Sequence, residues 1–194
     1  MEKPFIKNLL FKLLFSKEGF GFNPDDPNLK NTPDRLMRMY CNEFFRNVDQ
    51  DPKEIASFPN EGYDEIIMLD NITFTSICSH HFLPFQGHAW LLYIPDASLV
   101  GASKPVRIID FFSRKPQLQE RLCMDVINHF VQGVKPKGAM LVMRAGHGCM
   151  TCRGVNVESI SGMTTSAIYG AFKEQTVRNE GLDLIKISIM DRRG

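Results

Sequence analysis

The sequence predicts an α+β domain in which a four-stranded antiparallel sheet carries two helices on one face, preceded by N-terminal helices. The main observation is the order of the central segments, which read strand, strand, helix, helix, strand, strand. Composition agrees, because 194 residues that are 43% apolar and 23% charged suit one soluble domain with a substantial core. The chain shows no repeat and no low-complexity linker. We therefore expect an N-terminal helical region over residues 1–58 and a main domain over residues 59–194, acting as one unit.

The N-terminal region predicts two helices. Residues 4–16 place apolar side chains at helical spacing. Lysines interrupt this segment and no small-residue cleavage site follows it, so it predicts an amphipathic helix and not a signal peptide. A second helix is predicted from Thr32, as N-cap, and Pro33, at the first helical position, to about Asn47.

The main domain divides into segments of strand and of helix composition. Strands are predicted at Tyr63–Ile77, Gln86–Ile94, Gly138–Ala145 and Val155–Ile160. Helices are predicted from Ser103 to a break near Pro116, from there to about Val134, and over residues 166–187.

Charge and cysteine content limit the binding partners and the cellular compartment that we expect for the protein. The formal net charge is +1, so no global charge points to a nucleic acid or an anionic membrane. No run approaches the ~20 apolar residues of a membrane span. Five cysteines, an odd number in a chain of this size, favour a reducing compartment. We expect a cytoplasmic protein with neither a nucleic-acid nor a membrane partner.

Cysteine and histidine gather in two short segments, "CSHH" at Cys78–His81 and "HGCMTC" at His147–Cys152. Thiolate and imidazole are the ligands that zinc prefers. A closed structural site would use Cys78, His81, Cys149 and Cys152. A catalytic site would use three protein ligands and a water molecule whose pKa the metal lowers to about 7.

The two other histidines of these segments favour the catalytic alternative. His80 and His147 lie beside the ligand positions, where a closed structural site has no use for them. A hydrolytic site needs groups that give and take protons near neutral pH, and histidine is suited to this.

Basic side chains occur in pairs three residues apart, which places each pair on one helix face. Lys104 and Arg107 follow Ser103, the expected N-cap of a helix whose positive end attracts phosphate. Arg35 and Arg38 form a similar pair on the second helix. Each pair is a weak signal by itself.

Three further residues extend this pattern. Arg153 directly follows the cysteine segment, and with the two basic pairs it makes a set suited to a polyphosphate. Gln119 and Glu120 open the long helix, where a carboxylate is usually a partner of the helix dipole. Alternatively, Glu120 pairs with the N1–H and the exocyclic amine of guanine and so rejects adenine.

In this order the motifs resemble those of the GTP cyclohydrolase I family. The family patterns Cys-Glu-His-His, G-x-SK-x-x-R, Q-x-QERL, H-x-C-x-x-x-RG and TP-x-R all have counterparts within about residues 31–180. The resemblance implies the tunnelling fold (T-fold). It also implies zinc-dependent hydrolysis of GTP at C8, which yields formate and 7,8-dihydroneopterin triphosphate. A homodecamer of two pentamers, with sites at subunit interfaces, is implied as well.

The resemblance also implies residue roles. Cys78, His81 and Cys149 would bind zinc, and His80, His147 and Gln119 would be catalytic. Substrate would contact the remaining positions: Glu120 on guanine, Ser103, Lys104, Arg107 and Arg153 on the triphosphate and ribose, Arg35 and Arg38 from a neighbouring subunit, and Ser79 near the sugar or the catalytic water.

Two positions depart from the family. Ser79 stands where the family has glutamate, which removes one negative charge beside a metal ligand. Altered substrate choice such as dGTP, a partial reaction, a related purine or pterin substrate, and a non-catalytic zinc-bound homologue therefore stay open. Cys152 is a bystander, a redox-sensitive neighbour or a fourth ligand, and we favour the bystander. Folate, biopterin and deazaguanine pathways are equally compatible with the sequence.

Overall fold

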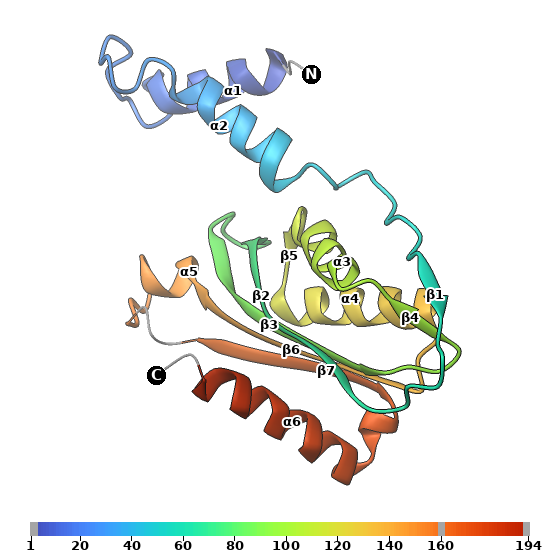
Figure 1. Ribbon diagram of the computed structural model, residues 1–194. Helices are drawn as coiled ribbons and strands as arrows, with labels where there is room; N and C mark the ends of the chain where they lie inside the picture. The colour runs from blue at the N-terminus through green and yellow to red at the C-terminus, as the bar shows by residue number, and fades with distance from the viewer. Residues whose placement is uncertain (1–3, 159–161, 192–194) are drawn as a thin grey trace.

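The fold is built around one twisted sheet, seen in a computed structural model that describes residues 4–158 and 162–191 (Figure 1). The strand order is β5-β2-β3-β6-β7. The strands span Ile67–Cys78 (β2), Pro84–Ile94 (β3), Pro116–Gln117 (β5), Gly138–His147 (β6) and Met163–Gly170 (β7). The four long strands are antiparallel neighbours, which confirms the predicted sheet.

Two short pairings add to the predicted sheet. β5 lies parallel to the end of β2, with Ile77 opposite Pro116 and Cys78 opposite Gln117. A separate two-stranded ribbon joins β1 (Ser57–Pro59) to β4 (Ser98–Val100). The first of these pairings matters for the site, because it fixes the end of β2 against the start of a helix.

Helices cover both faces of the sheet. α3 (Ser103–Ser113) and α4 (Gln119–Val134) pack on one face, as predicted, over a core that includes Leu122, Phe130 and Leu141. α6 (Gln175–Met190) lies across the opposite face (Figure 1), where Leu92, Met140, Phe172 and Ile185 form a second, smaller core. The order β2-β3-α3-α4-β6-β7 is the strand-strand-helix-helix-strand-strand order of the T-fold.

The last strand was predicted in the wrong place. Residues 155–158 are not a strand, and residues 159–160 of that prediction lie outside the described residues. The strand is β7, part of which was predicted as helix, and α6 begins only after the 3-10 turn η2 (Ala171–Lys173). Pairing with β6, from Ala145 opposite Met163 to Gly138 opposite Gly170, overrides the local helical composition.

The N-terminal helices form a hairpin beside the sheet domain (Figure 1). α1 (Pro4–Phe15) packs on α2 (Thr32–Arg38), and α2 continues as the π-helical segment η1 (Met39–Phe44). Thr32 and Ser103, predicted as N-caps, are the first helical residues, and the cap positions are Asn31 and Ala102. Among the described helices, none combines the length and apolar character that crossing a membrane requires.

Candidate metal centre

Cys78 and His81 are brought together by a tight turn after β2. The amide of Cys78 donates to Leu83 O, and the amide of Phe82 donates to Cys78 O, both at 2.9 Å. Phe82 adopts a positive φ of 52°, which turns the chain back on itself. As a result His81 Nδ1 lies 4.0 Å from Cys78 Sγ.

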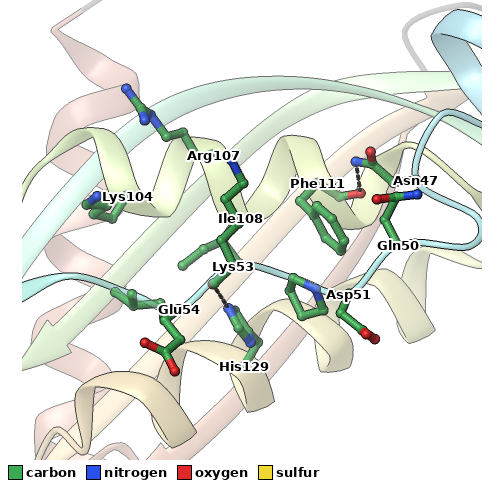
Figure 2. Close-up of a pocket in the computed structure, with 12 residues that line it drawn as sticks. Asn47, Gln50, Asp51, Lys53, Glu54, Lys104, Arg107, Ile108, Phe111 and His129 are labelled. Atoms are coloured by element: carbon green, nitrogen blue, oxygen red, sulfur yellow. Dashed lines mark hydrogen bonds between the residues drawn. The ribbon is translucent and has the colours of Figure 1, made fainter.

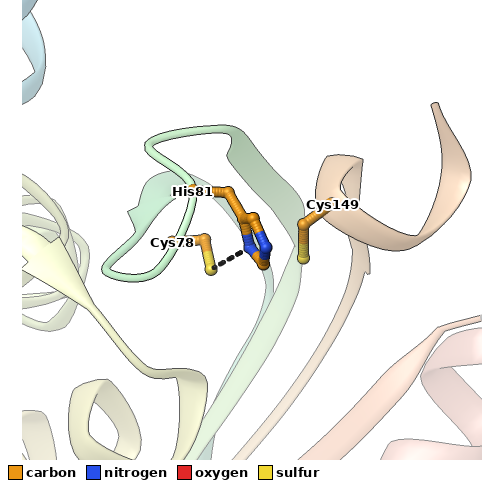
Figure 3. A group of neighbouring side chains, drawn as sticks. All are labelled: Cys78, His81 and Cys149. Carbon is orange, nitrogen blue, oxygen red and sulfur yellow. Dashed lines mark hydrogen bonds between the residues drawn. The ribbon is translucent and has the colours of Figure 1, made fainter. Parts of the chain in front are cut away.

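Cys149 reaches the same point from the turn α5 (Gly148–Thr151) that follows β6. Gly148 permits this approach, since a Cβ there would lie 2.9 Å from Pro84 O. The ligand atoms of Cys78, His81 and Cys149 all lie within 4.8 Å of one another (Figure 3). The structure thus brings the three predicted metal ligands together from two distant segments.

This donor set fits zinc. Zinc–sulfur and zinc–nitrogen bond lengths place S and N ligands of a tetrahedral ion about 3.5 Å apart. The observed 4.0 Å between Cys78 Sγ and His81 Nδ1 requires only a small contraction. Cys152 does not belong to the group: its Sγ donates to Gly148 O at 2.7 Å. That placement agrees with a catalytic three-residue site and not with a closed four-residue one.

Protonation at the group follows from its neighbours. Arg153 Nη1, which can only donate, lies 3.2 Å from His81 Nε2, so the neutral ring carries its proton on Nδ1, facing Cys78. Burial raises the pKa of the Cys149 thiol, and the neighbouring Cys78 raises it further. Because a metal binds thiolate and unprotonated imidazole nitrogen, metal binding here must release protons.

His147 is held in a defined orientation at the end of β6. Its ring stacks on Phe85, with centroids 4.7 Å apart and planes 2° apart, and its Nε2 lies 2.8 Å from Gln119 Oε1. The buried Gln119 donates its amide nitrogen to Met143 O and Met163 O, at 3.1 and 3.0 Å. Its Oε1 must therefore accept, so His147 Nε2 carries the proton and Nδ1 presents a lone pair.

Glu120 lies close enough to His147 to affect its charge. Burial lowers the pKa of His147, and the Glu120 carboxylate partly opposes that shift. Glu120 itself is exposed in the first turn of α4. The Glu120 carboxylate thus acts on the charge of the oriented imidazole from the solvent-exposed start of α4.

Sequence reasoning missed three residues that shape this centre. Phe85 stacks on His147, Thr165 Oγ1 lies 3.1 Å from the amide nitrogen of Gln119, and Arg121 Nη2 donates to Ser79 Oγ at 3.2 Å. Two of them had a signal in the sequence: Arg121 belongs to the Q-x-QERL motif, and Thr165 belongs to the segment MTTSAIYGAF, which resembles a threonine-rich segment of the family. The contacts themselves depend on strand register and helix packing.

Other predicted residues lie apart from the metal centre within one chain. Lys104 and Arg107 line a cavity of about 290 Å³ between α3 and the segment of residues 47–55 (Figure 2). Ser103 is exposed at the start of α3, and Arg35 and Arg38 are exposed on α2. His80 is exposed beside His81, with ring centroids 6.2 Å apart.

The fold and the site define a class: an α+β protein whose Cys-His-Cys group, suited to a metal ion, adjoins an oriented histidine. The sequence model of GTP cyclohydrolase I matches residues 10–186, so the chain belongs to the GTP cyclohydrolase I family. The chain is 42% identical to "GTP cyclohydrolase 1" of Acetivibrio thermocellus, over 95% of this chain and 98% of that protein.

Other relatives agree. "GTP cyclohydrolase 1" of Listeria monocytogenes is 41% identical over 87% of this chain and 90% of that protein. The protein of that name from Rhodopirellula baltica is 41% identical over 87% of this chain and 73% of its own length. Among solved structures, apo archaeosine synthase QueF-Like is 15% identical, covering 58% of this chain and 98% of its own, with a TM-score of 0.44. That likeness is too distant to bear on the activity.

Proposed function

We propose that the protein is a zinc-dependent GTP cyclohydrolase I, which hydrolyses GTP at C8, releases formate and forms 7,8-dihydroneopterin triphosphate. One observation carries the proposal: Cys78, His81 and Cys149 converge beside His147, whose ring Gln119 orients. Family membership and the names of the relatives support the same reaction.

We propose residue roles that combine the family resemblance with the placement of each side chain. When bound, zinc would supply a water molecule acidified to a pKa of about 7. His147 presents Nδ1 as an acceptor, since Gln119 holds the proton on Nε2. This lets His147 take and return protons as the guanine imidazole ring opens, while His80 serves the same purpose from the solvent side. Glu120 would bind the N1–H and amino group of guanine.

We further propose that the triphosphate site includes residues of a second subunit. Lys104 and Arg107 line a cavity that does not include the metal group, and Arg35 and Arg38 lie on the N-terminal hairpin. We therefore propose that the complete site lies at subunit interfaces of a homodecamer. The odd number of cysteines supports a cytoplasmic location. Zinc and Arg153 would come from one subunit, and the two basic pairs from its neighbours.

The edges of the sheet support a ring. β7 is an outer strand, and on the other side β2 is covered by β5 only at Ile77 and Cys78. Most of one edge of β2 and one edge of β7 thus have no strand partner among the described residues. Antiparallel pairing of β2 with β7 of the next subunit would satisfy both edges and close a pentamer.

Subunit complementation tests the proposal. Cys149→Ser removes a metal ligand, and Lys104→Met removes a phosphate contact. Each variant alone should be almost inactive with zinc and GTP, scored by formate release and by the fluorescence of oxidised neopterin. Co-expressed in equal amounts, the two should regain activity, because about one quarter of the interfaces then combine both intact halves. No recovery, with mixed oligomers verified by two tags, would contradict shared sites.

The products also decide among the alternatives that Ser79 leaves open. Formate with neopterin establishes the full reaction. Formate alone indicates that ring opening proceeds and cyclisation fails. If zinc-loaded protein gives neither product with GTP, dGTP is the next substrate, and inactivity with both indicates a non-catalytic homologue.

A further inference from the structure

Arg121 lies at an unusual place for a cation, in the first turn of α4. The positive end of a helix dipole disfavours a positive side chain there. Among the described residues, no carboxylate forms an ion pair with Arg121. A charge kept in an unfavourable position without a counter-charge suggests a role other than local helix stability.

The guanidinium of Arg121 joins the start of α4 to two other segments. Its Nε donates to Gln117 Oε1 at 2.7 Å, and its Nη2 donates to Pro116 O at 2.6 Å, both on β5. Nη2 also donates to Ser79 Oγ at 3.2 Å, on the turn after β2. One rigid, planar group therefore connects three elements, which a flexible lysine could not reproduce.

Those contacts converge on the segment that carries two metal ligands. Ser79 directly follows Cys78, and the amide of Ser79 donates to Gln117 O at 2.9 Å. Gln117 is fully buried and donates its own amide nitrogen to Phe112 O and Asp125 Oδ2, at 3.1 Å each. That pattern turns Gln117 Oε1 toward Arg121. Arg121, Gln117 and Ser79 thus form one hydrogen-bonded network next to Cys78.

The serine changes how this network works. A glutamate at position 79, the residue of the family pattern, would offer Arg121 a carboxylate and a charge-assisted bond. Ser79 offers only a neutral hydroxyl at 3.2 Å. In this chain, therefore, the turn after β2 is held by hydrogen bonds from the Arg121 guanidinium to Pro116, Gln117 and Ser79, and not by an ion pair.

We propose that Arg121 is a positioning residue for the metal centre: by binding Ser79 and β5 it holds Cys78 where the metal needs it. The inference rests on the proposed metal site. Hydrogen bonds that orient metal ligands from outside the coordination sphere typically change metal affinity by 10- to 100-fold when removed.

Metal titration of the full chain tests this inference. Arg121→Lys keeps the charge and loses the fork, and we expect zinc affinity, from competition with a chromophoric chelator, to fall about tenfold or more. Co²⁺ in place of zinc should show an altered sulfur-to-cobalt charge-transfer band. Arg178→Lys is the matched control, because Arg178 near the start of α6 also donates to two carbonyls, Phe172 O and Lys173 O. It should leave zinc affinity and the cobalt spectrum unchanged.

Two serine variants keep the test decisive if Arg121→Lys folds poorly. Ser79→Ala should weaken zinc binding severalfold, and Ser79→Glu should match or exceed the original affinity through an ion pair with Arg121. Zinc affinity within twofold of the original in Arg121→Lys would overturn the inference, and so would the same result in Ser79→Ala if Arg121→Lys does not fold. If the unaltered protein itself binds no zinc, the proposed function fails instead, so the two failures are distinguishable.

Discussion

The hydrogen bonds of Gln119 give a prediction whose size can be worked out from the structure. Gln119→Leu keeps the volume of a buried side chain but removes the four hydrogen bonds of its amide group, to Met143 O, Met163 O, Thr165 Oγ1 and His147 Nε2. A buried polar group left without a partner costs about 1–3 kcal/mol. Met143 is fully buried, whereas Met163 and His147 are half-buried and can recover some bonding from water. We expect a loss of about 2–4 kcal/mol in the free energy of unfolding.

Equilibrium unfolding in urea at matched subunit concentration measures this loss. Gln132→Leu is the control, because Gln132 is exposed on the same helix. Histidine ¹⁵N NMR at pH 8 supplies the second readout. In the unaltered protein His147 should be protonated on Nε2, and in Gln119→Leu the two tautomers should mix. A loss below about 1 kcal/mol, or a proton on Nδ1 of His147 in the unaltered protein, would refute the reasoning.

Four further predictions concern single residues. Cys152→Ala should retain one zinc per subunit by elemental analysis, because its thiol bonds to a carbonyl, and loss of zinc would favour a fourth ligand. Burial raises the pKa of Cys123 to about 12, so its alkylation in the native protein should stay far slower than that of the exposed Cys152 up to pH 9, as peptide mass spectrometry would show. Ser79→Glu should raise GTP turnover if the serine has lowered the catalytic activity of the site, and unchanged or lower turnover would contradict that explanation. Gly87→Ala should lower the free energy of unfolding by about 3 kcal/mol, since the new Cβ would lie 1.9 Å from Arg144 O, and urea unfolding near the original would contradict this.

Local sequence signals correctly predicted the elements in which the hydrophobic periodicity and the boundary residues indicate the same secondary structure. The strands that became β2, β3 and β6 and the two helices between them were placed within a few residues of their ends. The segment Met163–Gly170 was not predicted as a strand, because its composition suits a helix as well as a strand. Pairing with the edge of β6 makes it a strand. The expected caps failed for a similar reason, since a hydroxyl near a helix start caps only if the backbone enters at the right angle.

The sequence by itself determined which chemistry the protein can perform. Two thiols, three histidines and the motifs around them are fixed by residue type and spacing, and they point to zinc and a guanine nucleotide without any coordinates. Tertiary structure alone decided how these groups act on one another. Cys149 is separated from Cys78 by about seventy residues, and only the pairing of β3 with β6 brings their turns together. The same folding turns Gln119 toward His147 and Arg121 toward Ser79, because distances of about 3 Å depend on strand register and helix packing, which no local pattern encodes.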